Sequence, residues 1–104
     1  MVAIVENWAI VTGRVGEIVT VPEYRDFCAV ALDVEEVSGV EGYPNLLHAG
    51  PGSRLTVLVR RDVVRRERMT TGDRVSVRTR RGGKDRVFAH PEEVAVLERG
   101  APDR

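Results

Sequence analysis

The feature that most constrains this fold is a series of short, valine-rich stretches separated by turn-forming residues along the whole chain. Several stretches alternate apolar with polar residues, most clearly in residues 74–80, where Val75 and Val77 lie between arginines and a serine. A period of two is typical of a strand with one buried and one exposed face. Strands and turns at this spacing predict an all-β domain.

We expect the first strand over residues 8–15, with residues 17–21 either continuing it or forming a short returning piece. Gly13 within this strand indicates a bulge or a sharp bend. Pro22-Glu23 marks a turn, and the second strand then covers residues 24–37. Its alternation predicts a core face made of Cys28, Val30, Leu32 and Val34.

The remaining strands are expected over residues 54–60, 74–80 and 87–97, with the last interrupted at His90-Pro91 because proline donates no backbone hydrogen bond. Residues 38–53 are rich in glycine and proline and predict a long loop. The one helix candidate is residues 62–69, with Asp62 as its cap and arginines toward its C-terminal end. It lies between the third and fourth strands.

Length and composition favour one folded domain over residues 1–104, with a core over about residues 8–97. Cys28 is the single cysteine, so no internal disulfide can form, and a reducing, cytoplasmic location is expected. No apolar run is long enough for a membrane span, and residues 1–8 lack the pattern of a signal peptide. The sequence contains no recognisable phosphate-binding loop, nucleophile elbow or metal-ligand cluster. We therefore expect no catalysis, no cofactor and no metal.

Charge is distributed unevenly although the net charge is zero. Residues 1–53 carry two basic and eight acidic side chains, whereas residues 54–86 carry twelve basic and four acidic ones. Fifteen of the sixteen basic residues are arginine, which binds phosphates through two hydrogen bonds and stacks on flat rings. Two interpretations stay open: the acidic half pairs with the basic half inside the fold, or the arginines bind an anionic partner.

Three strands, a short helix and a two-strand hairpin is the element order of the OB-fold, a five-stranded barrel that binds oligonucleotides or oligosaccharides. Residues 10–15 (IVTGRV), 22–24 (PEY) and 27–32 (FCAVAL) resemble the opening of bacterial single-stranded DNA-binding proteins. Residues 72–78 (GDRVSVR) and 94–97 (VAVL) are similar to their fourth and closing strands, and the likeness is nearest to the primosomal members. This resemblance implies an OB-fold-like barrel that binds single-stranded DNA.

The candidate nucleic-acid-binding residues combine arginines with aromatic rings. Arginines that alternate along a strand can follow a phosphate backbone, and exposed rings can stack on bases. The chosen residues are Arg74, Arg78, Arg80, Arg81, Lys84 and Arg86, with Phe88 and Tyr24 as the stacking rings. The other aromatic residues, Trp8, Phe27 and Tyr43, are expected to fill the core or pin loops. The alternative for the arginines is a solvated face whose charge protects a sheet edge.

A second basic cluster surrounds the helix candidate, and it consists of Arg60, Arg61, Arg65, Arg66 and Arg68. Pairing of this cluster with Glu35, Glu36 and Glu41 is favoured over a role in binding. The leading function is therefore binding of single-stranded DNA or RNA. The alternative is a protein-protein interaction or assembly module built on the same barrel, and either is compatible with a homodimer or homotetramer.

Overall fold

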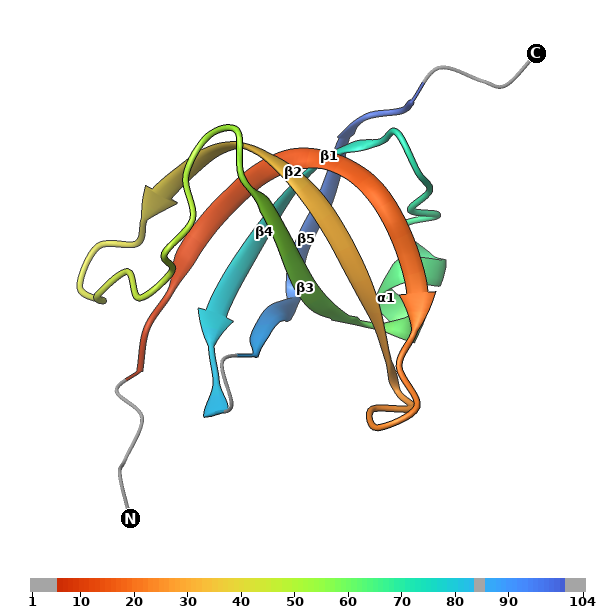
Figure 1. Cartoon of the computed structure of the whole chain (residues 1–104), viewed down its shortest axis with the longest axis horizontal. Helices are drawn as coiled ribbons and strands as arrows, with labels where there is room; N and C mark the ends of the chain where they lie inside the picture. The colour runs from red at the N-terminus through yellow and green to blue at the C-terminus, as the bar shows by residue number, and fades with distance from the viewer. Residues whose placement is uncertain (1–5, 84–85, 101–104) are drawn as a thin grey trace.

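The computed structural model describes residues 6–83 and 86–100 of the chain. Its strands form a closed five-stranded barrel in the order β1-β2-β3-β5-β4, and a single short helix follows β3 (Figure 1). The elements are β1 (Ala9–Thr20), β2 (Phe27–Gly39), β3 (Arg54–Arg60), α1 (Arg61–Arg66), β4 (Arg74–Arg81) and β5 (Val87–Glu98). The predicted all-β class, five strands and helix between the third and fourth strands are confirmed.

Valines fill the interior of the barrel, because the inward-facing position of each strand is apolar. The predicted core face of β2 is buried, as are Val75 and Val77 of β4. They pack with Val11 and Val15 of β1, Val57 and Val59 of β3, and Val94 of β5. Alternation within the strands therefore predicts the inner face of the barrel correctly.

Two irregularities let β1 curl far enough to pair with both β2 and β4. The register with β2 shifts at Thr12/Gly13 and again at Val15/Glu17, so residues 17–20 continue the strand rather than return. At Gly13 a Cβ atom would lie 2.5 Å from the carbonyl oxygen of Asp33. Only glycine permits this close approach of two backbones, which confirms the bend predicted there.

The helix is shorter than expected and begins differently. It covers Arg61–Arg66, its cap residue is Arg60, and the cap makes no side-chain hydrogen bond, so the prediction of Asp62 as the cap is wrong. The reason is that β3 runs directly into α1, which places Asp62 inside the first turn. The helix ends before Arg68, which adopts a positive φ of 51°.

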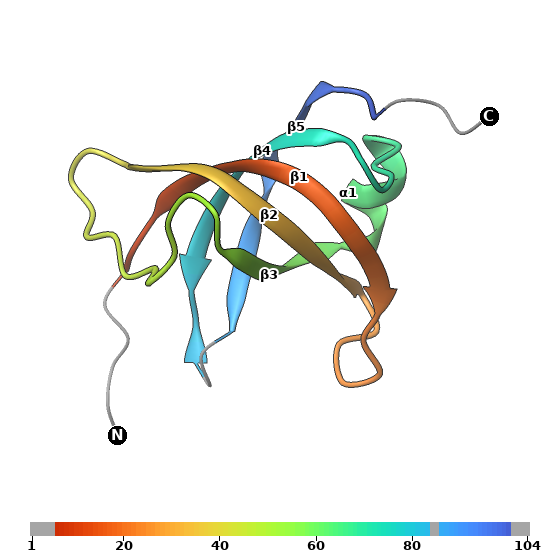
Figure 2. The ribbon, with the colours of Figure 1, turned by 45° about the horizontal axis from the view of Figure 1, so that its top comes forward.

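Most strand pairs are antiparallel, but β3 and β5 pair in parallel through Leu58 and Phe88. The expected interruption at His90-Pro91 is a register shift opposite Arg78, because Val77 pairs with Val94 while Thr79 pairs with Ala89. Figures 1 and 2 both show the β1–β2 turn and the adjoining ends of β4 and β5 at the same end of the barrel. In the described part of the chain, no helix is long and apolar enough to cross a membrane.

Candidate functional site

The outer surface of β1, β2 and β3 carries apolar residues where a solvated barrel would show polar ones. Val19 of β1 pairs with Ala29 of β2, Ala29 pairs with Leu58 of β3, and Leu58 pairs with Phe88 of β5. Leu58 alternates with the core residues Val57 and Val59, so its side chain lies on the outer side of the barrel. It is nevertheless only 3% exposed, which indicates that neighbouring side chains cover Leu58.

Three aromatic rings gather at the end of this row. Tyr24 comes from the β1–β2 turn, Phe27 begins β2, and Phe88 lies near the start of β5. Their ring centroids lie 6.3 Å apart for Tyr24 and Phe27, 6.0 Å for Tyr24 and Phe88, and 5.8 Å for Phe27 and Phe88. Each pair packs edge to face, the arrangement that the ring quadrupoles favour. All three side chains are partly exposed, so ring surface remains available to a ligand.

Each of these rings has a guanidinium group over it. Arg86 lies 5.7 Å from the Tyr24 ring centroid, Arg60 lies 5.9 Å from Phe27, and Arg80 lies 5.9 Å from Phe88. We call these three arginines and three rings the aromatic platform. Arg86 also forms an ion pair of 3.2 Å with Glu23, whereas Arg80 forms no ion pair among the described residues. The platform thus combines stacking surface with positive charge.

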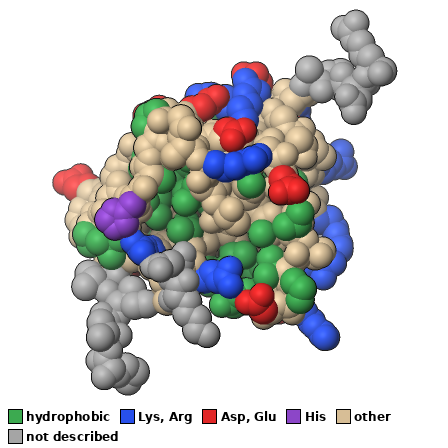
Figure 3. All heavy atoms as spheres, viewed as in Figure 1, with side chains coloured by type: hydrophobic (Ala, Val, Ile, Leu, Met, Phe, Trp, Pro, Cys, Tyr) green, Lys and Arg blue, Asp and Glu red, His purple; other side chains and the backbone are tan. Residues whose placement is uncertain are grey.

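A hollow of about 300 Å³ adjoins the platform and lies beside the β1–β2 turn. Its apolar floor includes Ala29 and Leu58, and Arg86 and the turn around Pro22 contribute to its sides. Figure 3 shows patches of hydrophobic side chains on the face seen in Figure 1, with arginines and carboxylates among them. The hollow and platform together form a groove between the β1–β2 turn and the β4–β5 hairpin.

Arg78 lies on the same outward-facing side of β4 as Arg80, two residues away, but it contacts another aromatic residue. Its guanidinium is 4.6 Å from the Trp8 ring centroid and forms a 2.9 Å ion pair with Glu93. His90 lies 5.5 Å from the same indole ring. Four of the five aromatic residues of the chain therefore have an arginine guanidinium over the ring.

Arg74 lies at the opposite end of β4 and takes part in an ion-pair network. It donates to Glu35 at 2.7 Å, while Arg14 lies 2.8 Å from Glu98 and 3.8 Å from Glu35. The hydrogen bond to Glu35 raises the pKa of Arg74, and the hydrogen bond from Arg14 lowers the pKa of Glu98. Arg74 is therefore occupied by carboxylates and lies away from the platform.

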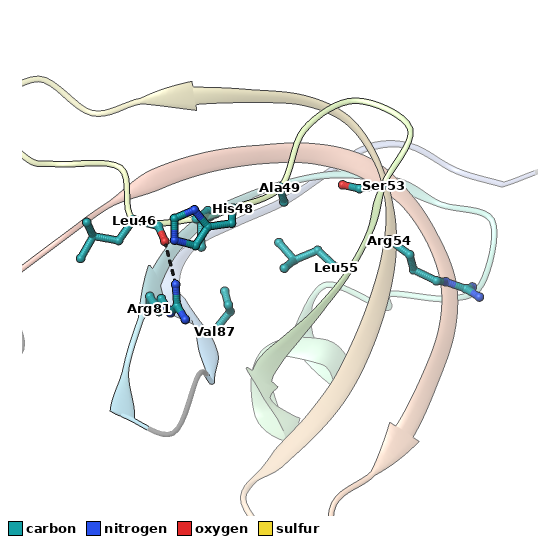
Figure 4. Close-up of a pocket in the computed structure, with 9 residues that line it drawn as sticks. Leu46, His48, Ala49, Ser53, Arg54, Leu55, Arg81 and Val87 are labelled. Atoms are coloured by element: carbon teal, nitrogen blue, oxygen red, sulfur yellow. Dashed lines mark hydrogen bonds between the residues drawn. The ribbon is translucent and has the colours of Figure 1, made fainter.

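Arg81, another of the predicted basic residues, contacts a loop rather than one of the rings of the platform. The Arg81 guanidinium points to the carbonyl oxygen of Leu46, 3.4 Å away, and lines a separate hollow of about 210 Å³ with His48 and Leu55 (Figure 4). This contact holds the 40–53 loop against the hairpin. Lys84 lies outside the described residues.

The helix arginines do not pair as expected. Arg60 lies 3.4 Å from Asp62 and Arg66 lies 3.1 Å from Glu67, so within the described residues the favoured pairing with Glu35, Glu36 and Glu41 is wrong. The reason is that Glu35 is taken by Arg14 and Arg74 on its own side of the barrel. Arg60 instead joins the platform, a role that its place beside Phe27 across the β2–β3 ladder explains.

The described residues contain no group of three histidine, cysteine or carboxylate side chains that could hold a metal ion. Comparisons of the chain with models of protein families, with characterised proteins and with solved structures find no match. The groove and its platform are thus interpreted from their own geometry.

Proposed function

We propose that this barrel is an OB-fold and that it binds single-stranded DNA or RNA in the groove across β1, β2 and β3. The strand order β1-β2-β3-β5-β4 with a helix between β3 and β4 is the arrangement expected of that fold. In OB-folds the ligand crosses the outer face of the second and third strands, between the β1–β2 and β4–β5 loops. The groove described here occupies that position.

The observation that carries the proposal is the aromatic platform. Nucleotides offer two features at once, a flat base and a phosphate charge, and an arginine beside a partly exposed ring matches both. Bases stack on Phe88, Phe27 and Tyr24, while Arg80, Arg60 and Arg86 contact the flanking phosphates. Because stacking uses the face that every base shares, this binding discriminates little among sequences.

The proposal is tested by fluorescence anisotropy of a labelled single-stranded oligonucleotide. We expect binding that weakens steeply between about 50 and 200 mM salt, as phosphate contacts require. The double variant Arg80→Gln/Arg86→Gln should weaken it strongly. The matched control Arg66→Gln/Arg68→Gln removes the same charge from positions that lie over no ring, and it should bind nearly as the parent does. An unmodified chain that fails to bind at about 50 mM salt would contradict the proposal.

A second candidate, a protein-protein interaction or assembly module, is favoured by two observations. Three of the predicted binding arginines, Arg74, Arg78 and Arg86, already hold carboxylate partners. The exposed Val19 stands at the margin of an apolar hollow. An apolar side chain of a second protein would fit that hollow. Light scattering tests self-assembly: a concentration-dependent dimer or tetramer that Val19→Lys dissociates would support it, and a monomer at all concentrations would exclude it.

A further inference from the structure

A third hollow, of about 280 Å³, is lined only by charged residues. It lies where the end of the β1–β2 turn meets the junction of β3 with α1. Its lining residues are Arg25, Asp26, Arg60, Arg61, Asp62 and Arg65. The lining therefore contains four arginines and two aspartates, which leaves a local charge of +2. We call this set the arginine pocket.

Two hydrogen bonds from Arg61 to backbone carbonyl oxygens connect the two sides of the pocket. The backbone N–H of Arg61 donates to the carbonyl oxygen of Asp26 at 2.8 Å, and the Arg61 guanidinium donates to the carbonyl oxygen of Arg25 at 3.1 Å. These bonds fix the β1–β2 turn to the start of α1. The position of Arg25 beside the helix is thus set by the fold rather than by an attraction between side chains.

The charge in the pocket is only partly neutralised. Among the described residues, its one ion pair joins Arg60 to Asp62 at 3.4 Å. In the same part of the structure, the Arg25 and Arg65 side chains make no ion pair or hydrogen bond. Guanidinium groups that are held close together without enough carboxylates favour an anion between them, and a phosphate matches their planar donors best.

One residue joins the pocket to the aromatic platform. Arg60 lines the pocket while its guanidinium lies over Phe27, and the two residues pair across the β2–β3 ladder. We propose that the arginine pocket binds a phosphate group of the nucleic-acid strand that lies on the platform. The nucleic-acid strand then begins at Arg80 and Phe88 and crosses Phe27. It ends at the pocket, beside Arg60, Arg25 and Arg65. This inference rests on the proposed function and gives the strand a direction toward α1, away from Arg74.

The test uses two lengths of labelled oligothymidylate and the double variant Arg25→Gln/Arg65→Gln. An oligonucleotide of about ten nucleotides reaches both the platform and the pocket. We expect the variant to bind it about tenfold more weakly and to lower the slope of log K against log salt by about 0.7, because the pocket contacts one phosphate and each single-strand phosphate contact contributes about 0.7. A trinucleotide, which the platform alone can hold, should bind the parent and the variant equally. Arg66→Gln/Arg68→Gln serves again as the charge-matched control.

The outcomes separate this inference from the function on which it rests. If the parent binds the longer oligonucleotide and the pocket variant keeps its affinity and salt slope, the pocket inference is overturned while nucleic-acid binding stands. If the parent binds no oligonucleotide, the proposed function fails, and calorimetry with inorganic tripolyphosphate then tests the pocket alone. Saturable binding heat that Arg25→Gln/Arg65→Gln abolishes would show that the pocket binds phosphate from a ligand other than nucleic acid. No binding heat would overturn the phosphate site itself.

Discussion

Asp73 offers the sharpest test of how the barrel is closed, because its side chain is a buried charge with several partners. It is 1% exposed and lies just before β4. One carboxylate oxygen accepts the backbone N–H of Gly100 at 2.8 Å. The other accepts the backbone N–H of Thr70 at 2.9 Å and a guanidinium hydrogen bond from Arg99 at 3.2 Å. Asp73 therefore fastens the chain after β5 to the turn before β4.

The change Asp73→Ala should lower the free energy of unfolding by about 2–4 kcal/mol. It leaves two backbone N–H groups without their acceptor, and each such loss costs about 1–3 kcal/mol. The Arg99 pair adds little, because its guanidinium is largely exposed and solvent screens the attraction. For a domain of this size, the expected fall in Tm is about 10–25 °C. Urea titration and thermal melting, both followed by circular dichroism, measure the two quantities.

The same carboxylate should make stability depend on pH. Burial alone raises the pKa of Asp73, but the hydrogen bonds from Gly100 and Thr70, with the charge of Arg99, outweigh burial and hold that pKa below its ordinary value. A depressed carboxylate pKa adds stability that is complete above the unfolded-state pKa and is lost as pH falls through the folded-state pKa. The stability difference between the parent and Asp73→Asn should thus be largest near neutrality and shrink below about pH 4. A difference that is constant down to about pH 3, or an Asp73→Ala effect under about 0.5 kcal/mol, would refute this reasoning.

Three further predictions concern the bend in β1, the platform and the core. Gly13→Ala should destabilise the barrel by more than about 1 kcal/mol in a urea melt, because its Cβ atom would meet the Asp33 carbonyl oxygen; an unchanged midpoint would mean that β1 can shift there. Phe88→Leu keeps apolar volume but removes a ring, so oligonucleotide affinity should fall by about 1–3 kcal/mol with the salt slope unchanged; a changed slope would point to lost phosphate contacts instead. Cys28 is 9% exposed, so its thiol should react with Ellman's reagent only at the rate at which the chain opens, and immediate reaction of the native protein would contradict its burial.

Local alternation in the sequence was enough to predict the strands and their inner faces. Val75 and Val77 alternate with arginines, and an all-polar outer face on β4 follows directly from a period of two. The same rule correctly placed Cys28 among the core residues of β2. These features depend only on neighbours in the chain, which is why a single sequence reveals them.

The composition of the platform could be predicted only in part, because it depends on register between distant strands. Tyr24 and Phe88 were selected because they stand next to predicted turns, Arg80 because arginines alternate along residues 74–80, and Arg86 because it lies in the basic hairpin tip. Arg60 enters the platform because the β2–β3 ladder places it opposite Phe27. That register spans the long 40–53 loop, and no local pattern specifies it. The helix boundary was wrong for a similar reason, since the direct passage from β3 into α1 is a tertiary feature.

The ion pairs explain why a chain of zero net charge can still have a basic groove. Carboxylates of the acidic first half form ion pairs with particular arginines. Glu35 pairs with Arg14 and Arg74, and Asp33 pairs with Arg54. Arg80, Arg25 and Arg65 hold no such partner within the described residues, and they border the platform and the arginine pocket. Because screening limits surface charges to a range of about 8–10 Å at physiological salt, a ligand in the groove responds to these local guanidinium groups rather than to the net charge. Neutrality of the whole chain is thus no obstacle to binding a polyanion, and loss of the arginines that line the groove and the pocket should weaken that binding.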